Sequence, residues 1–178
     1  MAGDERIRLF CGLQLPDDAL DELEAWQLRH LHGGRLVRRS DLHVTLAFLG
    51  ARPAAEAQPI AGELRAAAVE AAPVELRPLR YRETRAVGML VLEDVGGAAA
   101  ALAADLGRRL ERLGVYRREA RPWLAHVTVL RFRERAGVAA PPPNIRSIHV
   151  VRSALYRSTL GPLGARYDAL ETAPLGGR

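Results

Sequence analysis

The sequence contains little cysteine, no lysine and no long hydrophobic run. Its single cysteine, Cys11, excludes a disulfide within the chain and a metal cluster built on thiolates. Cys11 stands in an apolar run, where we expect a small buried hydrophobic side chain. No apolar run reaches the roughly 18–20 residues of a membrane-spanning helix. A basic segment followed by an apolar one is also missing at the N-terminus, so we expect no secretory signal. These absences predict a cytoplasmic protein.

Arginine alone carries the positive charge. The 178 residues include 26 basic residues, all of them Arg, and 21 acidic ones, which gives a net charge of +5. This excess suits a partner that bears phosphate groups. An Arg-, Ala- and Gly-rich chain can equally reflect the composition of its genome. With 48% hydrophobic residues the chain can bury a core, and its length predicts one domain over residues 1–178.

Hydrophobic periodicity predicts more strands than helices. Apolar runs predict strands over residues 7–15, 36–39, 42–49, 74–80, 87–95, 123–132, 145–155 and 166–170. Apolar residues three and four apart predict helices over residues 17–30 and 54–71, and a third helix after Gly96-Gly97. Consecutive strands favour antiparallel pairing, so the predicted fold class is α+β. A strand, a helix and a His-containing strand occur in each half, which predicts two lobes related by pseudo-twofold symmetry.

One tetrapeptide pattern occurs twice. Residues 43–46 (HVTL) and 126–129 (HVTV) share the form His-x-Thr-hydrophobic, and both fall in expected strands. A shuffled sequence of this composition would contain about 0.07 such tetrapeptides. Side chains two apart on a strand share a face, so each motif presents an imidazole and a hydroxyl together. If the motifs face each other, two imidazoles and two hydroxyls surround one small site.

Two imidazoles suit acid–base cleavage of a phosphodiester. One can accept a proton while the other donates one, because the unperturbed pKa of histidine is about 6.5. A hydroxyl two residues on can hold a phosphate oxygen. Two histidines without nearby Cys, Asp or Glu at ligand spacing fall short of the three or four ligands of a zinc site. The residues therefore predict chemistry without a metal or other cofactor.

The motif regions resemble a known superfamily. DLHVTLAFLG (residues 41–50) and AHVTVLRF (125–132) resemble the paired signatures of the two-histidine (2H) phosphoesterases. RLFCGLQLP near the start and LYRSTLGPLGARYDAL near the end are similar to segments of the bacterial and archaeal RNA 2′,3′-cyclic phosphodiesterases, also called 2′-5′ RNA ligases. The resemblance extends over nearly the whole chain. It implies a bilobal α+β fold of two antiparallel sheets that face a central cleft, with helices outside.

The same resemblance implies an activity and roles for residues. It implies metal-independent hydrolysis of a 2′,3′-cyclic phosphate to a 2′-phosphomonoester. His43 would protonate the leaving 3′ oxygen, and His126 would activate water as the base. Thr45, Thr128 and Arg131 would bind the phosphate. In a regular strand Arg131 faces away from His126, so this role requires a bend in the strand.

Other residues are weaker candidates. Phe10 could stack on a base, as aromatic side chains do with unpaired nucleotides, although core packing is the commoner role. Arg38 and Arg39 precede the first motif and could replace a Lys that many relatives carry at the position of Ala47. The residues whose roles the sequence leaves open are His149, Tyr156 and Tyr167.

The expected protein is a monomer that acts on RNA ends or nucleotides bearing a cyclic phosphate, with no membrane and no obligate protein partner. Two alternatives stay open. The same site could act on another cyclic-phosphate nucleotide or on 2′-5′-linked RNA, including ligation as the reverse reaction. The chain could instead be an RNA-binding module without catalysis, although both His and both Thr are retained.

Overall fold

The computed structural model describes residues 5–176, and strands dominate it. The helices are α1 (Asp17–His30), α2 (Ala57–Glu70) and α3 (Ala98–Arg112). The strands are β1 (Arg6–Gln14), β2 (Arg35–Leu36), β3 (His43–Pro53), β4 (Val74–Glu83), β5 (Val87–Val95), β6 (His126–Arg131), β7 (Ile148–Val150), β8 (Arg152–Gly161) and β9 (Gly164–Pro174). The three helices lie where the periodicity predicts them.

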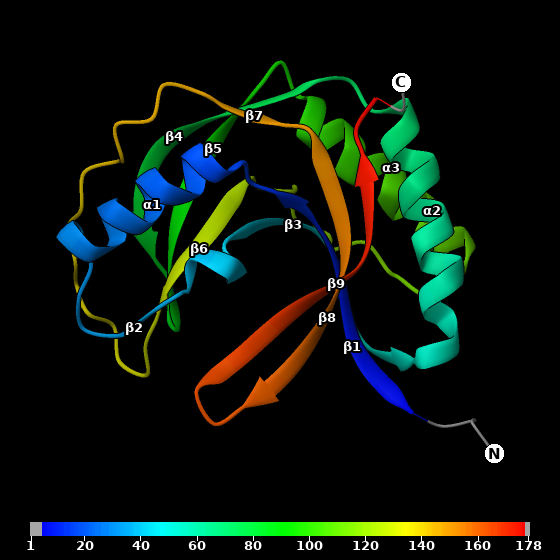
Figure 1. The fold of residues 1–178 in the computed structure, drawn as a ribbon, viewed down its shortest axis with the longest axis horizontal. Coiled ribbons are helices and arrows are strands. Elements are labelled where there is room, and N and C mark those ends of the chain that lie inside the picture. Colours follow the sequence, from blue (N-terminus) through cyan, green and yellow to red (C-terminus); the bar gives the residue numbers. More distant parts are fainter. Residues whose placement is uncertain (1–4, 177–178) are drawn as a thin grey trace.

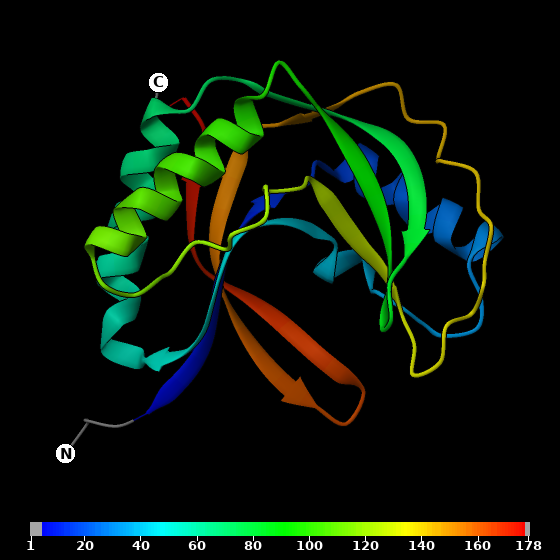
Figure 2. The ribbon, with the colours of Figure 1, turned by 180° about the vertical axis from the view of Figure 1, so that it is seen from behind.

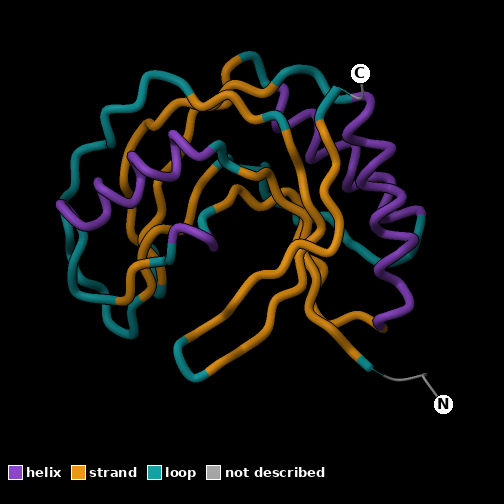
Figure 3. The backbone as a smooth tube through the Cα atoms, viewed as in Figure 1, coloured by secondary structure: helices purple, strands orange, loops and turns teal. Residues whose placement is uncertain are grey.

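The strands form one curved antiparallel sheet, which is visible in Figures 1 and 3. Its order is β7-β4-β5-β6-β3-β1-β8-β9, and β2 pairs with β6 beside this path. Helix α1 lies outside the half formed by β7-β4-β5-β6 (Figure 1). Helices α2 and α3 pack together outside the other half, β3-β1-β8-β9 (Figure 2). The predicted α+β class, antiparallel pairing and outer helices are confirmed.

The two expected sheets are joined by hydrogen bonds into one. Strands β3 and β6 meet at the centre through a single registered pair, Val44 with Val127. Beyond that pair β3 follows β1 along its whole length. Strand β2 then takes the place beside β6, where Arg35 pairs with Arg131 and Leu36 with Leu130. The halves thus share only a narrow backbone contact, and it lies between the two His-x-Thr motifs.

The strand expected over residues 145–155 is two strands in different halves. Strand β7 pairs with β4 at one edge of the sheet, whereas β8 pairs with β1. The chain crosses at Val151, whose side chain is 62% exposed. Strand β8 continues into a long hairpin with β9, which projects from the sheet in Figure 1. The short strand expected over residues 166–170 is the middle of β9.

Alternation along the central strands separates the core from the site. In β1, Leu9, Cys11 and Leu13 are fully buried in the main core. As expected, Cys11 is a buried small side chain, and its burial raises the pKa of the thiol to about 12. Phe10 and Gly12 occupy the opposite face of β1, toward the two motifs. No helix within residues 5–176 combines the length and the apolar character needed to cross a bilayer.

Candidate active site

Strands β3 and β6 bring the two motifs together. Because they run antiparallel from the pair of Val44 and Val127, His43 lies beside Thr128 and Thr45 lies beside His126. Both valines are fully buried, while the imidazoles and hydroxyls remain partly accessible on the other face. The structure therefore assembles the four side chains that the duplicated motif predicts, at the narrow join between the halves.

Both imidazoles are oriented by backbone carbonyls. Nδ1 of His43 lies 2.7 Å from the carbonyl oxygen of Asp41, and Nδ1 of His126 lies 2.9 Å from that of Leu124. A carbonyl oxygen can only accept, so each Nδ1 carries the proton and donates it. Nε2 of His43 lies 3.0 Å from Oγ1 of Thr45, whose hydroxyl can donate to it. Each histidine thus keeps Nε2 for proton transfer.

His43 is packed among aromatic rings. Its ring centroid lies 4.7 Å from that of Phe10 and 5.2 Å from that of Tyr167, which approaches edge-on. Burial lowers the pKa of His43 to about 4; the hydrogen bond to Asp41 opposes this shift, and the positive charge of Arg131 adds to it. The free protein at neutral pH therefore contains a neutral His43.

Phe10 is packed in a buried cluster, the commoner of the two roles considered for it, and offers no open face to a base. Strand β1 is internal to the sheet, and the Phe10 side chain is only 3% exposed. One ring face stacks on Tyr156, with centroids 4.8 Å apart, and Tyr167 meets its edge at 4.9 Å. Phe10 instead supports the ring of His43. Tyr156 and Tyr167 belong to the same aromatic cluster.

Arg131 reaches the motif face through a β-bulge. In the pairing of β5 with β6, Met89 faces Thr128 but Gly88 faces Leu130, so Val129 is an extra residue. Val129 and Leu130 are consequently both fully buried. The strand then resumes with Arg131 on the face of Thr128. The Arg131 guanidinium lies 3.3 Å from the Tyr167 hydroxyl and donates to it. The expected bend exists, and a bulge makes it.

The remaining candidates lie outside this cluster. Arg39 pairs with Asp17 and Asp21 at the start of α1, so it faces the helix rather than the motifs. Arg38 pairs with Asp41 at 2.8 Å and donates to the carbonyl of Ala165 on β9. His149 is exposed on the edge strand β7, opposite Glu75 on β4.

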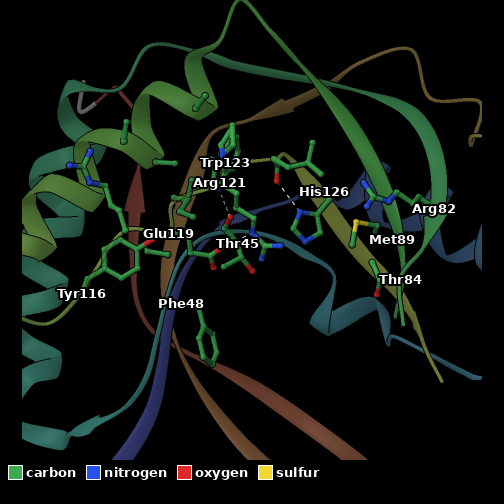
Figure 4. A pocket seen from close by; sticks show the side chains of 18 residues that line it. Thr45, Phe48, Arg82, Thr84, Met89, Tyr116, Glu119, Arg121, Trp123 and His126 are labelled. Carbon is green, nitrogen blue, oxygen red and sulfur yellow. Dashed lines mark hydrogen bonds and ion pairs between the residues drawn. The ribbon is translucent and has the colours of Figure 1, made fainter. Parts of the chain in front are cut away.

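A cavity of about 540 Å³ opens beside Thr45 and His126 (Figure 4). It extends from α3 and the segment that precedes β6 to the inner faces of β4 and β5. Trp123 on its wall donates from Nε1 to the carbonyl of Thr45, at 3.1 Å. Tyr116 lies at its other end in Figure 4. The cavity therefore leaves room beside one imidazole, whereas aromatic rings enclose the other.

Phe48 is a site residue that the sequence analysis missed. Its side chain lines this cavity and is 53% exposed, and the Arg8 guanidinium lies 5.5 Å from its ring centroid. A register shift in β3 buries Leu46 and Ala47 in succession and turns Phe48 onto the motif face. Phe48 follows His43 at the same interval at which Arg131 follows His126. That matching interval is the sequence signal that could have found it.

The groups around the two histidines are hydroxyls, aromatic rings and guanidinium groups. Within residues 5–176, no cluster of three or more His, Cys, Asp or Glu side chains is placed to hold a metal ion. The arrangement is suited to binding an anion next to two imidazoles. The hydroxyls and Arg131 can hold its oxygens, and the Nε2 atoms can move protons.

Comparisons with known proteins cover both halves of the chain. Residues 13–81 match the family model described as LigT like phosphoesterase. The RNA 2′,3′-cyclic phosphodiesterase of Escherichia coli K12 is 29% identical over 173 residues, which is 94% of this chain and 96% of that protein. The crystal structure of E. coli LigT complexed with 3′-AMP superposes with a TM-score of 0.81 at 25% identity, over 96% of this chain and 99% of that one. The crystal structure of TT0787 of Thermus thermophilus gives a TM-score of 0.83 at 28% identity, with the same coverage.

Proposed function

We propose that this chain is a LigT-like phosphoesterase, which its similarity to that family supports, and that it hydrolyses 2′,3′-cyclic phosphodiesters at RNA ends to 2′-phosphomonoesters. One observation carries the proposal: His43 lies beside Thr128 and His126 beside Thr45, each imidazole with its Nδ1 fixed by a backbone carbonyl and its Nε2 left for proton transfer. The E. coli relative that is similar over nearly the whole chain bears the name of this activity. We further propose that the enzyme is a cytoplasmic monomer.

The proposed mechanism needs only proton transfers. Thr45, Thr128 and Arg131 hold the cyclic phosphate. His126 takes a proton from water through Nε2 as the water oxygen bonds to phosphorus. The bond from phosphorus to the 3′ oxygen breaks, and His43 gives that oxygen a proton. The products are a 2′-phosphomonoester and a free 3′ hydroxyl. No metal or other cofactor takes part in these steps.

The low pKa of His43 constrains this assignment. Burial holds it at about 4, so His43 must gain its proton as the substrate binds. The negative charge of the bound phosphate favours that uptake. The same pKa favours the reverse assignment, in which neutral His43 is the base and His126 the acid. In both assignments the reaction needs one neutral and one protonated imidazole.

The cavity beside Thr45 and His126 offers space for the nucleoside that carries the phosphate. Phe48 offers a half-exposed ring on which a base can stack, a role that the sequence also allows for Phe10. Aromatic side chains stack on unpaired bases irrespective of sequence. This supports RNA ends or cyclic-phosphate nucleotides as the substrate class.

Turnover of uridine 2′,3′-cyclic phosphate and of a short RNA with a cyclic phosphate end tests the proposal. His43→Ala and His126→Ala should each lower kcat by about 10²–10⁴-fold. His149→Ala is the matched control, because His149 is exposed on the edge strand β7, and it should keep full activity. Phosphorus NMR should place the product phosphate on the 2′ oxygen, and EDTA should leave the rate unchanged.

Near-normal turnover in either site variant would refute the acid–base pair. The same two variants also assign the roles. A diester whose leaving group is p-nitrophenolate needs no proton from an acid. The variant that lacks the acid should therefore regain activity on that diester, whereas the variant that lacks the base should not.

A further inference from the structure

The bulge that presents Arg131 has an unusual support. The carbonyl oxygen of Val129, the extra residue, accepts from the backbone N–H of Val37 at 3.0 Å. It also accepts from Nε2 of Gln27, on α1, at 2.8 Å. The same amide nitrogen donates its second hydrogen to the carbonyl of Val37, at 2.9 Å. A single side-chain amide thus ties the bulge of β6 to the residue that follows β2.

Gln27 is buried for these contacts. It is 1% exposed and lies among the apolar residues by which α1 covers the sheet, beside Trp26 and Leu23. Burying a polar amide is unfavourable unless it is hydrogen-bonded. An apolar side chain would pack here without that requirement. The polar group is therefore explained by the two carbonyls that it bridges.

The bulge decides which way Arg131 points. With Val129 as an extra residue, Thr128 and Arg131 share one face of β6 although they are three positions apart. In a regular strand, Arg131 would turn toward the core and Leu130 toward the site. We propose that Gln27 is a positioning residue: by holding the Val129 carbonyl it fixes the bulge, and through the bulge it presents the Arg131 guanidinium to the phosphate. The proposal rests on the phosphate-binding role of Arg131 in the proposed function.

A double-mutant cycle tests this coupling. Gln27→Met keeps the length of the side chain and removes both donors. Inorganic phosphate is the probe, and its Kd is measured by calorimetry, together with kcat/KM on uridine 2′,3′-cyclic phosphate. Gln27→Met should weaken phosphate binding and lower kcat/KM about tenfold or more, as expected for a displaced binding group. In an Arg131→Ala background the same substitution should change both quantities less than twofold.

Two further variants complete the design. Gln27→Asn keeps an amide that is too short for both carbonyls, and it should behave as Gln27→Met does. Trp26→Phe, on the same helix, removes a hydrogen bond to the Pro141 carbonyl and should leave phosphate affinity unchanged. Thermal unfolding of each variant shows that it is folded at the assay temperature.

Equal losses in the two backgrounds would show a general structural role and overturn the proposal. It would also be overturned if both Gln27 variants, or Arg131→Ala itself, left phosphate affinity unchanged. Failure of both Gln27 variants to fold counts against it as well, since the proposed role is local. If the wild type bound phosphate through this coupled pair but hydrolysed no cyclic phosphate, the proposed function would fail while this inference stood.

Discussion

At the scale of single residues, His43 combines a reactive position with an enclosed environment. Phe10 and Tyr167 cover its ring, and the Asp41 carbonyl fixes its Nδ1 proton. This enclosure destabilises the charged form of the imidazole, and the pKa of His43 is therefore lowered to about 4. The same group should therefore influence both the reaction and the stability of the fold.

Acid should destabilise the wild type through His43. In the unfolded chain His43 gains a proton near its ordinary pKa of about 6.5, whereas in the folded protein it does so only near a pKa of about 4. The free energy of unfolding should therefore fall as the pH drops from 6.5 to 4, by at most about 3 kcal/mol. Urea unfolding at pH 7.5 and 4.5 should show this loss in the wild type and a smaller one in His43→Gln.

The exposed His149 provides the comparison for that measurement. His149→Gln should keep the acid sensitivity of the wild type. Parallel pH curves for the wild type and His43→Gln would show that the folded protein does not hold His43 in its neutral form.

At the scale of elements, β1 is the support on which the site rests. It lies between β3 and β8, and Gly12 pairs with Thr45 of the first motif. A Cβ on Gly12 would lie 2.9 Å from the carbonyl oxygen of Val44 and 3.4 Å from Cδ2 of His43. The His43 ring and the backbone of β3 occupy the space that a side chain would fill.

Gly12→Ala should therefore impair catalysis more than folding. The added methyl group should push β3 and the His43 ring outward and lower kcat/KM about tenfold or more. The cost of the extra methyl in a packed site is about 1–3 kcal/mol, which thermal unfolding should detect. Gly62→Ala on α2 is the matched control, because its nearest contact is 3.9 Å away, at the Arg65 guanidinium. Unchanged kinetics for Gly12→Ala would show that β3 can shift without disturbing His43.

Elements around the motifs could be predicted, whereas their irregularities could not. The period of apolar residues identified the three helices and most strands, because each buries one face. The bulges at Leu46 and Val129 could not be predicted from the sequence, since two adjacent buried residues look like ordinary apolar residues in a run. They decide the positions of Phe48 and Arg131. The sequence could not decide between stacking and core packing for Phe10, because its burial comes from Tyr156 and Tyr167, on strands distant in sequence.

At the scale of the whole molecule, arginines from both halves surround the cavity. Arg82 comes from β4, and Arg118 and Arg121 come from the segment between α3 and β6. Arg118 pairs with Glu111 and Arg121 with Glu119, while Arg82 is exposed. An RNA strand that extends from the reacting phosphate along this cavity would place its backbone phosphates near Arg82.

Binding of an RNA strand should consequently depend on salt more than binding of a mononucleotide does. Each phosphate neutralised on a single strand contributes about 0.7 to the slope of log affinity against log salt. Arg82→Ala should reduce the slope for an oligonucleotide by about this amount and leave KM for the cyclic mononucleotide unchanged. Arg112→Ala, at the end of α3 and away from the cavity, should not change the slope. Identical slopes for the wild type and Arg82→Ala would place the RNA backbone elsewhere.

The split between β7 and β8 shows what sequence patterns miss at this scale. Alternation through Val151 predicted one strand, because the residues on each side continue the same period. The two segments nevertheless pair with β4 and β1 in opposite halves. Which neighbour a strand pairs with depends on the whole topology, and the local period does not contain that information.

This crossing also has a consequence for how the molecule forms. The half with β4–β7 takes its segments from three separate stretches of the chain. Segments of the half with β1, β3, β8 and β9 come before, between and after these stretches in the sequence. A contiguous fragment of the chain thus contains neither half on its own. Folding must therefore close long loops, which slows it. Because the single pair of Val44 with Val127 joins the halves, the two histidines reach the active geometry only when both halves have formed.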